Sequence, residues 1–272
     1  GHHADAIEPF PYTDPNVSQT RHFLSLPIAH KPGTHFVYNT PASFMLSAIV
    51  QKATGTPLVD YLGPRLFEPL GIRSPRWDAT PKGVSLGGFG LSATTEDIAR
   101  FGQLYLRKGE WNGRRLLPAE WVEAATSRQV SNGSNPRSDW EQGYGYQFWR
   151  CRHGAYRGDG AFGQYCIVLP DQDAVVAITG GVRDMQAVLD LVWEHLLPAM
   201  TAAPLPADAA AQDRLAKRMG ALVLPPVAGQ PSSPNARRVA GRAFAFPKND
   251  DGLEAVAVHL GPEPRLVVTS EG

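Results

Sequence analysis

Tyr38 is the residue whose type and setting most clearly suggest chemistry. It stands in F-V-Y-N-T at residues 36–40, a turn that is directly followed by a helix-forming pattern. A phenol hydroxyl in such a turn can donate or accept a proton, which is what general acid–base catalysis requires. The alternative is a core tyrosine that packs at the start of a helix and has no chemical role.

A nucleophile to accompany this tyrosine is harder to find. Ser92 lies in G-L-S-A-T at residues 90–94, which resembles the G-x-S-x-G nucleophile elbow but lacks its last glycine. We therefore expect Ser92 to belong to a loop that leads into the next helix. Cys151 and Cys166 are too few for a disulfide framework and lack metal-ligand spacing. Two buried free thiols are favoured over a pair joined across neighbouring strands, and no cofactor or metal is expected.

The elements that must position these residues fall into separate runs of helices and strands, an α+β order. Prolines keep residues 1–35 irregular. The spacing of apolar residues and the caps predict helices over 41–54, 57–67, from Thr94, from Pro118, and over 185–196 and 209–219. Aromatic and β-branched runs predict strands over 144–151, 164–169, 174–179, 242–246, 253–260 and 265–269.

Two further features concern the edge of a binding site. Residues 127–143 are polar and predict a long loop of the kind that often borders a site. Aromatic side chains lie near the end of this loop or just after it, and they either line a pocket or fill the strand core. They are Trp140, Tyr144, Tyr146 and Trp149.

Composition divides the chain into three parts. Residues 1–200 hold the helices and strands of one domain. Residues 201–237 are rich in Ala and Pro and predict a helix with a linker. Residues 238–272 predict three short strands, which are few for an independent module. We therefore expect them to be the start of a small C-terminal β module.

Five segments together resemble the penicillin-recognising serine hydrolases, which comprise class C β-lactamases, D-alanyl-D-alanine carboxypeptidases and related esterases and amidases. In chain order they are F-V-Y-N-T at 36–40, G-G-F-G-L-S-A-T-T-E-D-I-A-R-F at 87–101, W-N-G-R-R-L-L-P-A-E-W-V at 111–122, Y-G-Y-Q-F-W at 144–149 and G-D-G-A-F-G-Q-Y-C-I-V-L-P at 158–170. Each is weak alone, but their shared order makes the resemblance specific. It implies a β-lactamase/transpeptidase-like antiparallel sheet with flanking helices and a site between the sheet and a helical region.

The resemblance implies acyl transfer through an ester on a serine hydroxyl. The family supplies that serine in a Ser-x-x-Lys motif, and a tyrosine opposite takes the serine proton and passes it to the leaving group. Tyr38 matches this tyrosine. Beside an ammonium group, a phenol loses its proton more easily than its ordinary pKa of about 10 suggests. None of the six lysines in this chain has a serine three places before it.

Two other positions depart from the family pattern. Gly158-Asp159-Gly160 stands where the family has a Lys- or His-x-Gly triplet, so the basic residue is missing. The strand backbone can still donate to an oxyanion, although a plain glycine turn is the alternative. The family's Tyr-x-Asn is replaced by Tyr38, Asn39 and Thr40. These departures favour an ester or small amide over a β-lactam. The substrate-binding residues are then Asn39, Thr40, Gly158, Asp159 and Gly160.

Composition also limits the partners. Lys plus Arg and Asp plus Glu number 26 each, so no net field attracts nucleic acid. No apolar run reaches the length of about 20 residues that spans a bilayer. We expect a small-molecule ester or amide substrate, no nucleic acid and no membrane span. The oligomeric state stays open. Composition does not determine the compartment, but members of the family that the chain resembles are often exported.

The missing motif leaves two hypotheses. In the first, the chain is an internal piece of a longer serine hydrolase, and the nucleophile segment lies outside these 272 residues. The start in mid-architecture and the unfinished β module favour this hypothesis. In the second, the chain is a binding protein that kept the fold and lost the nucleophile.

Overall fold

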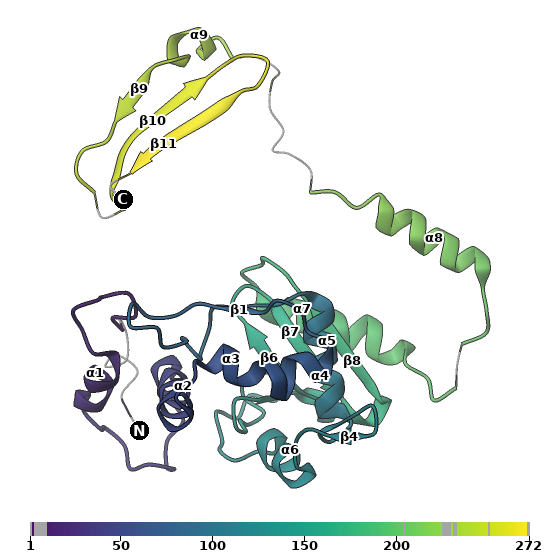
Figure 1. The fold of residues 1–272 in the computed structure, drawn as a ribbon. Helices are drawn as coiled ribbons and strands as arrows, with labels where there is room; N and C mark the ends of the chain where they lie inside the picture. The colour runs from purple at the N-terminus through teal and green to yellow at the C-terminus, as the bar shows by residue number, and fades with distance from the viewer. Residues whose placement is uncertain are drawn as a thin grey trace. The chain divides into compact units, whose positions relative to one another are not determined.

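The computed structural model describes residues 2, 10–203, 205–224, 230, 233–249 and 251–270. The chain divides into two compact units, Gly1–Leu205 and Pro206–Gly272. Figure 1 shows the elements of both units.

The first unit contains the helices and the main sheet. Its helices are α1 Gln19–Ser25, α2 Thr40–Thr54, α3 Leu58–Leu62, α4 Glu68–Leu70, α5 Thr95–Leu106, α6 Ala119–Thr126 and α7 Met185–Leu191. Its π-helical turns are η2 Gly63–Phe67 and η5 Val192–Leu196, and its 3₁₀ turns are η3 Arg152–Gly154, η4 Pro170–Gln172 and η6 Leu197–Ala199. Its strands are β1 Arg76–Trp77, β2 Leu91–Ser92, β3 Glu110–Trp111, β4 Arg114–Arg115, β5 Trp149–Arg150, β6 Tyr156–Gly160, β7 Gln164–Leu169 and β8 Ala174–Ile178.

Helices α2 and α5 begin within one residue of their predicted starts at Pro41 and Thr94. The Asn39 side chain accepts a hydrogen bond from the Ala42 amide at the start of α2, and Gly55 ends the helix in the left-handed conformation at φ 71°. In α5, Thr94 and Asp97 form the expected capping box. The expectation of an irregular segment 1–35 is wrong at α1, a helix of seven residues that fits between Pro15 and Pro27.

The main sheet has the antiparallel order β5-β6-β7-β8. On one face, Tyr165, Ile167 and Leu169 of β7 pack against Leu189 of α7 and Trp193 of η5. On the other face, Val168 joins Tyr105 of α5 and Val122 of α6. Alternate residues of one strand therefore bury against helices on opposite faces of the sheet, which is an α+β layout.

Two strand assignments differ from the sequence-based expectation. The strand predicted over 144–151 is reduced to Trp149–Arg150, because Gly143 and Gln147 have φ of 115° and 67° and interrupt the extended backbone. Strand β6 contains Gly158-Asp159-Gly160, so the triplet is strand and not a glycine turn. It pairs with β7 in the register Gly158↔Cys166, Asp159↔Tyr165 and Gly160↔Gln164.

The two cysteines are free and buried, as expected. Cys151 packs in the core beside α7, whereas Cys166 lies under α5, where its thiol donates to the Ile98 carbonyl at 3.4 Å. Burial raises the pKa of Cys151 to about 11 and that of Cys166 to about 12. Both thiols are therefore protonated and unreactive at neutral pH.

The second unit contains α8 Ala209–Gly220, α9 Ala236–Val239 and the strands β9 Ala243–Ala245, β10 Leu253–His259 and β11 Arg265–Ser270. The strands form an antiparallel sheet in the order β11-β10-β9, close to the three predicted strands. Within the described part of the chain, no helix is long and apolar enough to cross a membrane.

Candidate functional site

Tyr38 lies just before α2 and meets the edge of the main sheet. Its ring stacks on Trp149 of β5, with centroids 5.5 Å apart and planes 23° from parallel. Tyr144 meets the Tyr38 ring edge-on at 6.4 Å. The Tyr38 side chain is nevertheless 52% exposed. The residue is thus fixed by its ring and open to solvent, which a core tyrosine would not be.

Trp149 of β5 has its ring beside the Arg157 side chain of β6. The two residues are directly opposite in the β5–β6 register. The Arg157 guanidinium lies 5.6 Å from the Trp149 ring and 4.5 Å from the Trp140 ring, and the residue is fully buried. Contacts of this kind are favourable when the cation is withdrawn from water.

Arg157 forms a buried ion pair with Asp159, two residues further along the same face of β6. Arg157 Nη2 is 2.9 Å and Nε 3.1 Å from Asp159 Oδ2. Arg157 Nη1 donates to the Asp139 carbonyl at 2.8 Å. The Asp159 carboxylate is therefore occupied by a neighbour in its own strand, and its expected role in binding substrate stays a prediction.

The charge of the Asp159 carboxylate affects the pKa of Tyr38. The partial burial of the Tyr38 ring raises the pKa of its hydroxyl, and the nearby Asp159 carboxylate raises it further. Burial also raises the pKa of Asp159, against the opposing effect of Arg157. The sequence-based mechanism requires a phenol of lowered pKa beside a lysine. In this chain the described surroundings have the opposite effect, so Tyr38 keeps its proton at neutral pH.

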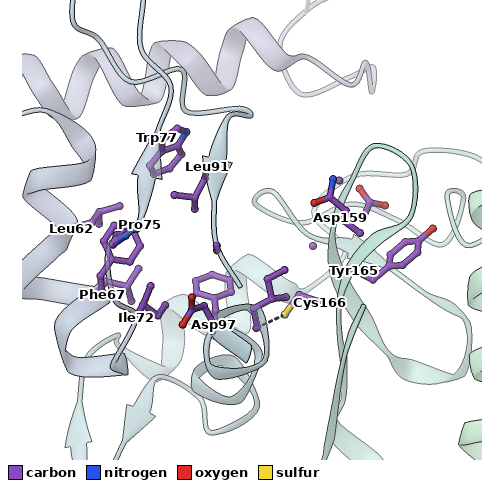
Figure 2. A pocket seen from close by; sticks show the side chains of 17 residues that line it. Leu62, Phe67, Ile72, Pro75, Trp77, Leu91, Asp97, Asp159, Tyr165 and Cys166 are labelled. Carbon is purple, nitrogen blue, oxygen red and sulfur yellow. Dashed lines mark hydrogen bonds between the residues drawn. The ribbon is translucent and has the colours of Figure 1, made fainter. Parts of the chain in front are cut away.

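The glycines of β6 border a largely apolar cavity of about 430 Å³. Figure 2 shows Leu62, Phe67 and Trp77 on one side of it and Asp159 and Cys166 on the other. A Cβ atom built on Gly158 would meet nothing within 4 Å, whereas one on Gly160 would come within 3.3 Å of Gln164. The backbone of β6 is therefore accessible from the cavity at Gly158.

A second cavity of about 270 Å³ lies beside Tyr38. Ser43 and Gln147 also line it, and the Ser43 hydroxyl donates to the Gln147 side-chain oxygen at 3.0 Å. Tyr38 and residues 158–160 thus line two different cavities, and Asp159 is the residue that relates them. Asp159 lines the first cavity, and its carboxylate raises the pKa of Tyr38.

Asn39 and Thr40 serve the start of α2. The Asn39 side-chain oxygen caps the helix, and its Nδ2 lies 3.2 Å from His2 Nδ1. Thr40 is the first residue of the helix, and its methyl group faces the backbone of Gly88. Both side chains have structural partners, and their roles in binding substrate stay predictions.

Asp139 anchors the long loop 127–143, and this role was not predicted from the sequence. Its carboxylate is fully buried and accepts hydrogen bonds from Arg152, Gln186 and Trp193, each at 3.0 Å or less. Burial alone would raise the pKa of Asp139, but these hydrogen bonds hold it below its ordinary value. The anchored loop supplies the carbonyl that accepts from Arg157.

Arg157 and Asp139 had only weak signals in the sequence. Arg157 and Asp159 are opposite charges two places apart, the spacing of one strand face, but the sequence predicted no strand at these residues. Asp139 lies in a polar loop, where an acidic residue is ordinary. Its partners are 13 to 54 residues distant, so no local pattern reveals them.

A family model described as Beta-lactamase matches residues 8–180. That range is more than half of the chain, and the chain therefore belongs to the β-lactamase family, as the resemblance implied. Members of this family are hydrolases. The antiparallel sheet with helices on both faces is the β-lactamase/transpeptidase-like fold.

Individual proteins are similar to parts of this chain in sequence or in structure. The 6-aminohexanoate-dimer hydrolase of Paenarthrobacter ureafaciens is 28% identical over 148 residues, which are 52% of this chain and 38% of the relative. A Bacillus anthracis protein assigned as a 6-aminohexanoate-dimer hydrolase superposes with a TM-score of 0.58 and 23% identity, over 68% of this chain and 50% of its own. The octameric penicillin-binding protein homologue of Pyrococcus abyssi gives a TM-score of 0.51 and 17% identity, over 88% and 56%. These two structures show the fold alone. The chain spans about two fifths of the length of the curated relative.

Proposed function

We propose that this chain carries the proton-handling side of an acyl-transfer site that cleaves an ester or a small amide through an acyl-serine intermediate. Tyr38 transfers the proton, and the β6 backbone at Gly158–Gly160 contacts the acyl group. The observation that carries the proposal is the position of Tyr38. This half-exposed phenol stacks on Trp149 of β5 and lies close enough to Asp159 for the carboxylate to raise its pKa.

The nucleophile belongs, in this proposal, to a Ser-x-x-Lys segment outside these 272 residues. The chain contains no such motif, and it matches 38% of the length of its curated relative. The apolar cavity beside Gly158 supports the same idea. It is large enough for several apolar side chains, and such a surface is stabilised when the apolar face of a helix covers it. A helix seated there would carry its serine next to β6.

The raised pKa of Tyr38 explains why the Ser-x-x-Lys segment is needed. A phenol whose pKa is raised by burial and by a carboxylate is a poor base at neutral pH. A lysine ammonium group nearby would lower that pKa, because it stabilises the phenolate. The same lysine would then make the serine easier to deprotonate.

The substrate class follows from the absent basic residue and from the relative. Without a lysine or histidine at position 158, the site has no cation at that place to hold an acidic substrate. The curated relative is named for hydrolysis of a 6-aminohexanoate dimer. A dimer of an amino acid is joined by an amide bond, so small amides and esters are the first substrates to test.

The test compares this chain with a longer natural form of the protein. Each is incubated with a fluorophosphonate probe and with p-nitrophenyl acetate, and adducts are located by mass spectrometry. We expect no adduct and no burst from the 272-residue chain. In the longer form we expect one adduct on the serine of a Ser-x-x-Lys motif. A longer form that stays unlabelled would refute the proposal and favour a binding protein.

A further inference from the structure

The segment that carries Tyr38 is held by ring contacts. Among the described residues, no backbone hydrogen bond connects residues 35–38 to the rest of the chain. Phe36 and Tyr38 instead place their rings against Trp149, at centroid distances of 5.8 and 5.5 Å. Tyr144 also meets the Phe36 and Tyr38 rings, at 5.1 and 6.4 Å, but Trp149 is the ring that stacks on the phenol. The orientation of the phenol therefore depends chiefly on the Trp149 indole.

That indole has little freedom of its own. Trp149 is 8% exposed and also meets Tyr144 edge-on at 4.8 Å. Arg157 touches its ring and is itself fixed by Asp159, by the Asp139 carbonyl and by Cys151 Sγ at 3.2 Å. A guanidinium with several fixed partners cannot change rotamer without breaking hydrogen bonds. A rigid support of this kind is what a reacting group needs.

We propose that Trp149 is the positioning residue of Tyr38, and that Arg157 holds Trp149 in the orientation that serves this purpose. The inference rests on the proposed function, because it explains how the phenol keeps a fixed direction when no backbone hydrogen bond within the described residues holds its segment. Trp149 does not touch the reacting atoms. It acts through the ring of Tyr38, and it differs from an ordinary core residue in that its stacking partner is half exposed.

Three variants of this chain test the inference without any turnover. Tyrosine is labelled with carbon-13 at the ring carbon that bears the hydroxyl, and the Tyr38 signal is assigned by its loss in Tyr38→Phe. Trp149→Phe keeps an aromatic face, Trp149→Leu removes it, and Trp121→Leu is the control. Trp121 is 47% exposed and pairs with Tyr146, away from Tyr38.

In Trp149→Leu we expect the Tyr38 signal to move toward that of free tyrosine and its titration to move down toward the ordinary pKa. Trp149→Phe should retain most of the wild-type position, and Trp121→Leu all of it. A Tyr38 signal that does not change in Trp149→Leu would overturn the inference. So would equal changes in Trp149→Phe and Trp149→Leu, because packing volume would then explain the effect.

The longer form adds a kinetic readout. Turnover is divided by the number of active sites that the fluorophosphonate probe titrates, which removes the effect of misfolded molecules. We expect Trp149→Leu to lower this per-site kcat by about 10-fold to 10²-fold, with a smaller change in KM, because a displaced proton-transfer group costs about that much. An unchanged per-site kcat in Trp149→Leu would refute the positioning role of Trp149. An unchanged turnover in Tyr38→Phe would instead refute the proposed function itself.

Discussion

Arg157 and Asp159 form an ion pair of 2.9 Å on one face of β6, and neither side chain is more than 8% exposed. The pair lies between the core and the candidate site. Arg157 contacts Trp149, which stacks on Tyr38, and the Asp159 carboxylate raises the pKa of the same tyrosine. A buried pair of charges in the sheet thus affects both the orientation and the acidity of the phenol.

The first prediction concerns the stability of this pair. Arg157→Leu leaves the Asp159 carboxylate buried without its partner, and we expect the free energy of unfolding to fall by about 3–5 kcal/mol. Urea unfolding followed by tryptophan fluorescence measures it. The double variant Arg157→Leu/Asp159→Leu should recover part of the loss, because no buried charge remains.

A matched control for this prediction is the exposed pair Arg107–Asp173. Its side chains are 50% and 63% exposed at a distance of 2.7 Å. Arg107→Ala should change the free energy of unfolding by at most about 1 kcal/mol. Equal losses in Arg107→Ala and Arg157→Leu would contradict the role of burial.

The second prediction concerns the titration of Tyr38. The difference between wild type and Tyr38→Phe in alkaline ultraviolet titration should show a phenol that titrates above its ordinary value of 10.0. Asp159→Asn removes a negative charge that opposes the phenolate, so the pKa of Tyr38 should fall. Because the folded pKa of Tyr38 lies above the unfolded one, its contribution to stability is present below pH 10.0 and is lost as the pH rises further.

The control for the titration is Asp173→Asn, which removes a carboxylate at an exposed ion pair. It should leave the Tyr38 titration where it is. If Asp159→Asn raised the pKa of Tyr38 or left it unchanged, the coupling between the two residues would be disproved.

The third prediction concerns the loop anchor Asp139. Asp139→Asn leaves the side chain neutral among donors that favour a carboxylate, and we expect a loss of about 3 kcal/mol at neutral pH. The folded pKa of Asp139 is lowered from 3.8, so its contribution is present above that pH and is lost as the pH falls through the folded pKa. The wild type should therefore lose its advantage over Asp139→Asn in acid, as measured by urea unfolding at several pH values. A difference that stays constant with pH would exclude the carboxylate charge as its cause.

Helices were easier to predict from the sequence than the site. Pro41, Thr94 and Gly55 are local signals, and the helices α2 and α5 begin or end within one residue of them. Strand β6 has no comparable signal, because two of its five residues are glycine and two are charged. Its pairing with β7 and the burial of Arg157 are long-range effects that a local pattern does not contain.

The residues of the candidate site also differ in how well the sequence predicts them. Tyr38 could be found because its turn and the segments downstream resemble a family. Trp149 was visible only as one of several aromatic residues near a loop, and nothing local distinguishes it from Tyr146. The difference is that Trp149 packs between β6 and the Tyr38 segment, whereas Tyr146 is 45% exposed beside Trp121.

The most direct test of the central claim is the turnover of Tyr38→Phe in the longer form, measured with p-nitrophenyl acetate and with a small amide. Tyr146→Phe is the control, since it removes the same hydroxyl from a tyrosine outside the candidate site. The account predicts that Tyr38→Phe lowers kcat by about 10²-fold or more, as the loss of a general base does, while Tyr146→Phe stays near wild type. A Tyr38→Phe enzyme with wild-type kcat would contradict it.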